Sequence, residues 1–399
     1  MPQPIRKSVI EKKPELEKQP FYSLIIDGNN LLRISMADTK VNTSGIHYGA
    51  IFQFLLQMRI MLQKKAYDYV YVFFDGHRSG LKRFEIYPDY KSNRPDKNYA
   101  SMLHYDELSD YGKAFEDRIR KMQDYLFNKN KPKREKSDTE KFVDENFARE
   151  RDILLKYFNE LYIRWCFDDN DETEGDDYIA YYVLNKRPEE RIVIMSSDHD
   201  LTQLISDTVC IYDPKLKKFI TKENMVKYRG VVVENVVIEK IVCGDSSDNI
   251  RNIEGVSTNR LHELMPEISE RPITINEIKE RAQEKIDERI KEKKKPLKWH
   301  ENIINGATKG NYDGDFYEIN RKIIDLREML ISDNAMTELK DMMYNVQDPE
   351  GRSFGNLYQY IVEDDITELR EENKFATFFE PFKSLAEKEI ARYKKEIKK

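Results

Sequence analysis

Short apolar runs alternate with amphipathic segments along the first half of the chain. The runs that have the length of a strand are Phe21 to Ile26, Tyr69 to Phe74, Arg191 to Met195 and Thr208 to Tyr212. The segments that place apolar side chains at helical spacing are Gly49 to Lys64, Phe147 to Trp165 and Asp176 to Asn185. Buried strands that alternate with helices predict an α/β fold around a mostly parallel sheet.

The pattern changes outside this alternating region. Residues 1–20 lack apolar periodicity, and we expect them to be a disordered tail. Between about residues 81 and 146 lysine and arginine become dense, with aromatic residues among them, which indicates either a mobile insertion or a set of exposed helices. Residues Val236 to Val242 form a short apolar helix or strand, and the chain after Pro266 is charged and predicted to be helical. The lysine-rich end, Lys383 to Lys399, fits a solvated helix better than a phosphate-tracking surface.

Composition and charge exclude few classes of protein. The chain has 399 residues, with 67 Lys and Arg against 73 Asp and Glu, so its formal net charge is -6. The three cysteines are scattered, and no stretch is long and apolar enough for a membrane span or a signal peptide. A reducing, cytoplasmic compartment therefore fits the sequence. Net acidity argues at first sight against a polyanionic partner, but that depends on where the acids lie.

Acidic residues follow three of the predicted strands at a similar place. Asp27, Asp75 and Asp198 should converge, because the carboxyl ends of parallel strands line one crevice. Further acids can reach the same crevice from a helix start, a loop and a later turn. The full set of carboxylates is Asp27, Asp75, Glu174, Asp176, Asp177, Asp198, Asp200, Asp245 and Asp248.

Nine carboxylates cannot lie together without compensating charge. Oxygen ligands suit Mg²⁺ or Mn²⁺, and two such ions about 4 Å apart can clamp a phosphodiester during hydrolysis. Each motif alone has a plainer explanation, since Asp27 can belong to an ordinary turn and Glu174 to Asp177 can cap a helix. Asp245 and Asp248 could form a cap in the same way. The combination of all five clusters favours a site for two metal ions.

Six motifs in this order resemble the flap endonuclease and 5′→3′ exonuclease family, close to its bacteriophage ribonuclease H type. The motifs are Ile26-Asp27-Gly28-Asn29-Asn30, Phe73-Phe74-Asp75-Gly76, Tyr87-Pro88-Asp89-Tyr90-Lys91-Ser92-Asn93-Arg94, Glu174-Gly175-Asp176-Asp177, Ser196-Ser197-Asp198-His199-Asp200-Leu201 and Gly244-Asp245-Ser246-Ser247-Asp248-Asn249-Ile250. Glu254-Gly255-Val256 and the run from Glu318 to Leu326 are also similar to family segments. The resemblance covers about residues 21–326.

The resemblance implies a PIN-like (Rossmann-like) sheet with an inserted helical arch and a helix–three-turn–helix segment. It divides the chain into a disordered tail (1–20), a nuclease core (21–230) with the arch at about 81–146, a duplex-binding region (231–330) and a helical C-terminal extension (331–399). Nothing in the sequence shows what the extension does.

The resemblance also implies roles for individual residues. One metal would lie among Asp27, Asp75, Glu174 and Asp176, and the second among Asp177, Asp198, Asp200, Asp245 and Asp248. Lys91 and Arg94 would steer and polarise the scissile phosphate, and Tyr90 would stack on a base. Gly255 would let the backbone approach a duplex phosphate, and a K⁺ ion could lie at that turn. Ser257 replaces the second glycine usual in the family, which puts the geometry of the turn in question.

We expect a metal-dependent, structure-specific nuclease that removes 5′ flaps, and RNA primers or DNA, from the 5′ end, including ribonuclease H-like activity. Its partners would be branched or 5′-ended DNA and RNA/DNA duplexes. A single-strand-binding or other replication protein could join them around a monomeric enzyme, in the host cytoplasm if a phage encodes it. The alternatives are a PIN-type ribonuclease and a catalytically inactive flap-binding module. Without the nine clustered acids the rest of the chain is slightly basic, so its net acidity no longer excludes nucleic acid.

Overall fold

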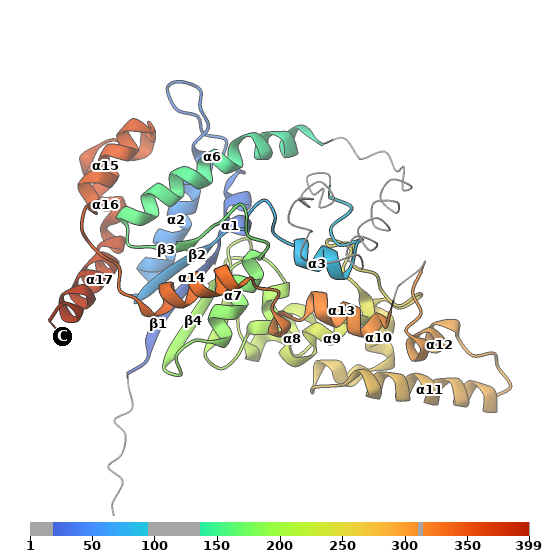
Figure 1. The fold of residues 1–399 in the computed structure, drawn as a ribbon. Helices are drawn as coiled ribbons and strands as arrows, with labels where there is room; N and C mark the ends of the chain where they lie inside the picture. The colour runs from blue at the N-terminus through green and yellow to red at the C-terminus, as the bar shows by residue number, and fades with distance from the viewer. Residues whose placement is uncertain (1–18, 95–135, 310–313, 399) are drawn as a thin grey trace, which may run out of the picture.

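A single sheet of six strands organises the protein. The computed structural model describes residues 19–94, 136–309 and 314–398 (Figure 1). The sheet has the order β3-β2-β1-β4-β5-β6, and every neighbouring pair is parallel except β5 and β6. The strands are β1 Phe21–Asp27, β2 Tyr69–Phe73, β3 Arg164–Cys166, β4 Glu190–Met195, β5 Val209–Asp213 and β6 Lys218–Ile220. This confirms the α/β fold and the four predicted strands.

Helices cover both faces of the sheet, which explains why its strands read as continuous apolar runs. Leu24 and Ile26 point into one core and Ile25 into the other, as the alternation of side chains along a strand requires. The first core is covered by α1 Gly28–Ser35, α2 Gly49–Lys64 and α6 Asp138–Glu160. The second is covered by α7 Gly175–Leu184, α9 Val236–Cys243, α13 Phe316–Ile324 and α14 Asp333–Tyr344.

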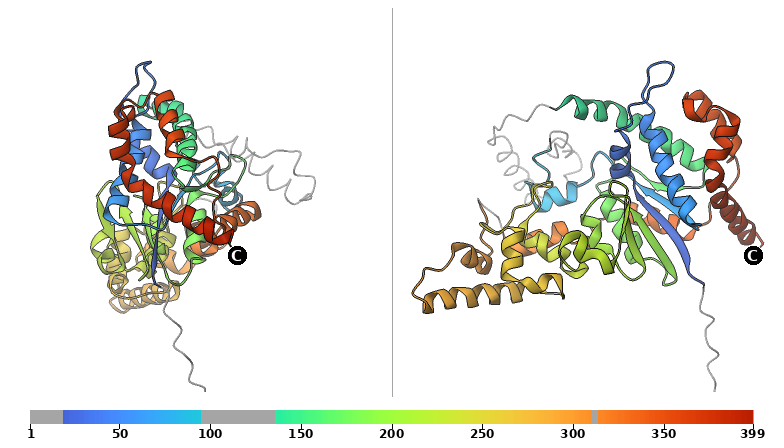
Figure 2. Two further views of the ribbon diagram at one scale, coloured as in Figure 1. Left: turned by 90° about the vertical axis from the view of Figure 1, so that its left-hand side faces the viewer. Right: turned by 180° about the vertical axis from the view of Figure 1, so that it is seen from behind.

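The second core extends beyond the sheet into the region predicted to bind duplex. Leu261 and Ile278 belong to the same buried cluster as Tyr178 of α7. The remaining helices of this half are α3 Leu81–Ile86, α8 Met225–Arg229, α10 Thr258–Leu264, α11 Ile275–Lys291 and α12 Lys298–Asn305. Figures 1 and 2 show α11 and α12 projecting from the end of the molecule opposite the C-terminal helices.

The C-terminal extension covers the first core. The part that does so consists of α15 Phe354–Glu363, α16 Glu372–Phe379 and α17 Lys383–Glu396, whereas α14 of the same extension covers the second core. Phe379 and Phe382 are fully buried in this core, and Phe378 packs against Phe52 of α2 with 5.7 Å between ring centroids. The buried pair of Arg164 and Glu389 ties α17 to the edge strand β3. Among the described residues, no helix is long and apolar enough to cross a membrane.

Two predicted segments differ in detail from the observed elements, and two observed strands were not predicted. The helix predicted from Phe147 to Trp165 is α6, which starts earlier because Ser137 and Glu140 form a capping box, and the chain then turns into β3. Strands β3 and β6 were missed, because three residues are too few for a periodic pattern. The segment Val236 to Val242, predicted as helix or strand, is helix α9. Residues 95–135 of the predicted arch lie outside the described residues.

Candidate active site

A crevice lies where three adjacent parallel strands end. Asp27 is the last residue of β1, Asp75 follows β2 and Asp198 follows β4. Two adjoining pockets share Asp198 and Asp200 in their walls. Together the pockets are lined by eight of the nine predicted carboxylates, namely Asp27, Asp75, Glu174, Asp176, Asp198, Asp200, Asp245 and Asp248. The convergence expected from the strand ends is therefore present in the fold.

Hydrogen bonds to nearby backbone and side-chain groups orient these carboxylates. Asp27 caps α1 by accepting from the backbone N–H of Asn30 at 2.9 Å, and it also accepts from Ser196 Oγ at 2.8 Å. Asp75 accepts from the backbone N–H of Gly175 at 2.5 Å. An added Cβ at Gly175 would lie only 3.0 Å from the Asp75 carboxylate, so a glycine is favoured where these two elements meet. The glycine of the Glu-Gly-Asp-Asp motif thus brings two acidic segments into contact.

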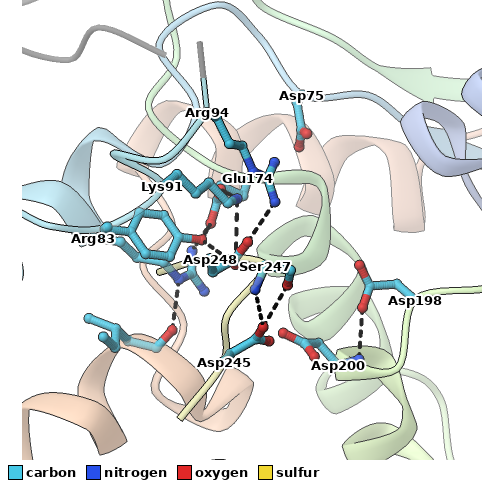
Figure 3. Close-up of polar contacts among 12 residues, drawn as sticks. Asp75, Arg83, Lys91, Arg94, Glu174, Asp198, Asp200, Asp245, Ser247 and Asp248 are labelled. Carbon is cyan, nitrogen blue, oxygen red and sulfur yellow. Dashed lines mark hydrogen bonds and ion pairs between the residues drawn. The ribbon is translucent and has the colours of Figure 1, made fainter. Parts of the chain in front are cut away.

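The first part of the predicted arch supplies positive charge to the same crevice. Lys91 Nζ contacts a carboxylate oxygen of Glu174, and Arg94 pairs with Asp248 at 2.6 Å (Figure 3). Both cations line the larger pocket. Burial opposes the charged form of Lys91, but Glu174 and the neighbouring groups raise its pKa well above the usual value. Lys91 is therefore a permanently charged cation within the carboxylate cluster.

Burial and repulsion between neighbouring carboxylates raise the pKa of two acids in the crevice, because too little positive charge lies nearby. Burial, followed by the charges of Asp198 and Asp75, raises the pKa of Asp27 to about 7. Burial and the charges of the neighbouring carboxylates also raise the pKa of Asp176 well above its usual range. In the described part of the chain no three such side chains are close enough to form a ready metal cluster. The donors are nevertheless all carboxylate oxygens, the ligand type that Mg²⁺ and Mn²⁺ take.

A model of the family described as 5′-3′ exonuclease, N-terminal resolvase-like domain, matches residues 22–234, more than half of the chain. The chain belongs to the 5′-3′ exonuclease family. One family relative, a 5′-3′ exonuclease of Mycoplasmopsis pulmonis, is 37% identical over 93 residues, or 23% of this chain and 31% of that protein. A 5′-3′ exonuclease of Aquifex aeolicus is 25% identical over 236 residues, or 58% of this chain and 64% of that protein. The chain thus spans less than two thirds of either relative.

Solved structures show the same family fold. The flap endonuclease of bacteriophage T5, in a complex with DNA and metal ions, matches with a TM-score of 0.54 at 17% identity, over 81% of this chain and 98% of that one. The same phage protein co-crystallised with metal ions gives a TM-score of 0.52 over the same shares of the two chains. At this identity the likeness establishes the fold alone, and it confirms the PIN-like architecture expected from the sequence.

Two placements differ from what the family resemblance implied. Asp177 lines neither pocket, because it is fully buried and pairs with Arg83 at 2.5 and 3.0 Å. Its assignment to a metal therefore does not fit its position. Tyr90 is also buried, with its hydroxyl donating to Glu174 at 2.9 Å and to Asp248 at 3.2 Å. A ring enclosed in this way is not available to stack on a base, and it instead orients two carboxylates.

Two cations that the sequence interpretation missed belong to the same network. Arg83 contacts Glu174 at 2.6 Å as well as Asp177, and it donates to the carbonyl of Ile323 at 3.0 Å. Lys240 bridges Asp200 and Asp245, and the contact to Asp245 is 2.6 Å. Arg83 lies in a basic stretch that gave no sign of a special role. Lys240 could have been noticed in the sequence, because it is the only cation in the apolar helix Val236–Cys243.

The predicted duplex-binding turn has the required backbone geometry at one position. Gly255 is exposed and has a φ of +84°, in the left-handed region that favours glycine. Ser257 has a φ of -122°, so glycine is not required there. Its side chain instead caps α10 by accepting from the backbone N–H of Arg260 at 3.4 Å. The departure from the family pattern at Ser257 is therefore compatible with this turn.

Proposed function

We propose that this chain is a metal-dependent, structure-specific 5′ nuclease that removes 5′ flaps, and RNA primers or DNA, from 5′ ends in replication or repair. The single observation that supports this most is the gathering of eight carboxylates, Lys91 and Arg94 at one crevice of a 5′-3′ exonuclease fold. The flap endonuclease of phage T5 was crystallised with DNA and with metal ions, and we propose ligands of the same kinds for this chain.

Two Mg²⁺ ions, or Mn²⁺ in their place, fit the donor set. Asp27, Asp75, Glu174 and Asp176 would hold one of them. The set around the second ion would be Asp198, Asp200, Asp245 and Asp248. When bound, such ions supply the positive charge that activates water and offsets the charge developing on the phosphate.

The chain's own cations have a separate task in this mechanism. Lys91 and Arg94 are held at the crevice by Glu174 and Asp248. From these positions the two cations would bind the scissile phosphate through charge-assisted hydrogen bonds. Tyr90 and Arg83 keep Glu174 in place through hydrogen bonds and ion pairing. The substrate would be positioned by phosphate contacts rather than by base reading.

Residues 231–330 would serve as the duplex-binding region, with Gly255 and Ser257 at the turn that approaches the phosphates. A K⁺ ion at this turn is a weaker part of the proposal, because the guanidinium of Arg260 already donates to the carbonyl of Gly255. The substrates would be branched or 5′-ended DNA and RNA/DNA duplexes. A monomeric enzyme and a replication-protein partner stay predictions.

The alternatives are weaker on specific grounds. A PIN-type ribonuclease does not need Asp245, Asp248 and the Gly255 turn, all of which adjoin or extend the crevice here. An inactive flap-binding module does not need eight carboxylates gathered beside Lys91.

A labelled 5′-flap duplex incubated with the protein tests the proposal. We expect cleavage near the base of the flap with Mg²⁺ and no cleavage in EDTA. Asp198→Asn should abolish cleavage and leave binding intact. Intact binding without cutting in either Mg²⁺ or Mn²⁺ would refute the nuclease and favour the binding module, and preferential cutting of single-stranded RNA would favour the PIN-type ribonuclease.

A further inference from the structure

The loop between α11 and α12 carries an unusual concentration of positive charge. We call residues 291–298 the tip loop, because they lie at the far end of the projecting α11 (Figures 1 and 2). It contains one acid, Glu292, and five exposed lysines, namely Lys291, Lys293, Lys294, Lys295 and Lys298. In a chain with a formal charge of -6, this local excess of cations needs an explanation.

The balance of positive and negative charges along α11 ends where the helix reaches the tip loop. Along the body of α11, Arg281 pairs with Glu267 at 2.9 Å and Lys285 pairs with Glu288 at 2.8 Å. In the tip loop, only Lys294 and Lys298 have a carboxylate partner, at 2.8 and 4.0 Å. Within the described ranges no carboxylate lies within 4.0 Å of the other three lysines. A solvated helix face with balanced charges, the ordinary explanation of a Lys- and Glu-rich segment, describes the body of α11 but not its tip.

The tip loop is held in shape by its own hydrogen bonds. Arg289 Nε donates to the carbonyl of Lys295 at 2.8 Å, and the backbone N–H of Lys294 donates to the carbonyl of Arg289 at 2.8 Å. The backbone N–H of Lys293 closes a turn on Ile290 at 2.9 Å. Arg289 is thus folded against the loop, while the lysines stay exposed on an ordered backbone. Such a backbone is already ordered before a polyanion binds, so the cost of ordering the loop itself is small.

The tip loop is contiguous with the predicted duplex-binding turn. Trp299 follows it directly, and its Cβ lies 3.2 Å from the position that a Cβ on Gly255 would occupy. The guanidinium of Arg260 lies 5.8 Å from the centroid of the Trp299 ring. Lys293 is six residues from Trp299, which spans at most about 20 Å of chain. Along the axis of a duplex each strand carries one phosphate per about 3.4 Å, so this reach corresponds to at most about six base pairs.

We propose that the tip loop binds the phosphate backbone of the duplex arm that extends beyond the Gly255 turn. The proposal rests on the proposed function, because it assigns the same substrate a second, more distant contact. Lysines on an exposed loop make sequence-independent contacts, so the tip loop would add affinity for long duplex arms without changing which bond is cut.

The test compares three full-length proteins that all carry Asp198→Asn, so that bound DNA is not cut. One has no further change, and one carries K293Q/K294Q/K295Q. The matched control carries K394Q/K395Q/K398Q, which removes the same charge from the end of α17 and the turn that follows it. Binding to 5′-flap DNA in Mg²⁺ is measured against salt, with a long duplex arm and with an arm truncated at the turn.

For the long arm, we expect the tip variant to bind at least about fivefold more weakly at low salt. The slope of log affinity against log salt should become shallower by up to about 0.9 for each phosphate that the variant no longer neutralises. The control should match the parent, and all three proteins should bind the truncated arm equally. The inference would be overturned if the tip variant bound the long arm as tightly as the parent. It would also be overturned if the control lost as much affinity as the tip variant, or if the tip variant lost equal affinity for the long and the truncated arm. In those cases cleavage by the wild-type protein would still support the proposed function, whereas a wild-type protein that binds no flap DNA would overturn both.

Discussion

Two guanidinium nitrogens of Arg83 donate to the carboxylate of Asp177, over 2.5 and 3.0 Å. Both side chains are buried, and Arg83 also reaches Glu174 at the edge of the crevice. The pair therefore anchors α7 behind the carboxylates of the crevice rather than within them.

Replacing Arg83 should destabilise the fold. Arg83→Met leaves Asp177 buried without its partner, and we expect the free energy of unfolding to fall by about 3–5 kcal/mol. Arg83→Lys should recover only part of this loss, because lysine cannot donate through two fixed nitrogens. Arg281→Met breaks an exposed pair and should cost at most about 1 kcal/mol. Urea unfolding of the three variants measures these differences, and equal losses for Arg83→Met and Arg281→Met would contradict the assignment.

Lys240 should neutralise part of the negative charge of Asp200 and Asp245, the two carboxylates that it contacts. Burial opposes ionisation of Asp245, but Lys240 lowers its pKa to about 2. Lys240→Met leaves Asp200 and Asp245 facing each other, and without divalent ions the free energy of unfolding should fall by about 2 kcal/mol. Saturating Mg²⁺ should recover part of this loss, because another cation then compensates the acids. Thermal melts with EDTA and with Mg²⁺ provide the measurement, and a variant as stable as the wild type in EDTA would refute the role.

The stability of the fold should depend on pH through His47, which lies outside the crevice. Burial opposes the charged imidazole, but the hydrogen bonds to Glu150 and to the carbonyl of Asp38 raise its pKa overall, against a smaller opposing effect of Arg149. Because the folded-state pKa is raised, this stabilisation is fully present below about pH 6.5 and is lost as the pH rises through the folded-state pKa.

The difference between wild type and His47→Gln isolates this contribution, since the other titrating groups are shared. The free energy of unfolding, measured in urea at pH 6 and pH 8.5, should differ more between the two proteins at pH 6. A constant difference across this range would mean that His47 does not titrate as described.

The C-terminal extension should matter for stability rather than for chemistry. Phe379 is fully buried among α16, α17 and their neighbours, and Phe379→Ala should cost about 3–5 kcal/mol. The exposed Tyr344 provides a control, and Tyr344→Ala should change stability by less than about 0.5 kcal/mol. The cleavage rate per folded molecule should stay the same in both variants. A Phe379→Ala protein that keeps wild-type stability but cuts more slowly would assign the extension to catalysis instead.

The strands that carry the site could be predicted because each is an apolar run that stops at an acid, as Asp27 and Asp75 illustrate. Orientation within a helix was harder. Asp176 and Asp177 are adjacent, and consecutive side chains on a helix point in directions about 100° apart, so one faces the crevice and the other the interior. The partner that decides this, Arg83, is 94 residues away in sequence. A local sequence pattern cannot predict an ion pair between residues that are so far apart in the chain.

The covering of the first core by the C-terminal helices was equally hidden. The apolar spacing around Phe379 indicates a helix but not which surface that helix covers. Tyr90 illustrates the same limit at the site, because an aromatic residue in a charged segment reads as a surface contact. Its ring is buried in a cluster that also contains Phe84 of α3 and Tyr178 of α7, which are distant from each other in sequence.

The most direct test of the proposed nuclease is the single-turnover rate of 5′-flap cleavage as a function of Mg²⁺ concentration, for the wild type and Asp176→Asn. We predict that the wild-type rate rises from zero to saturation with Mg²⁺, and that Asp176→Asn, folded and bound to the flap, cuts at least about 100-fold more slowly. A wild-type rate that does not depend on the divalent ion, or an Asp176→Asn protein that cuts at the wild-type rate, would contradict a metal-dependent site at this crevice.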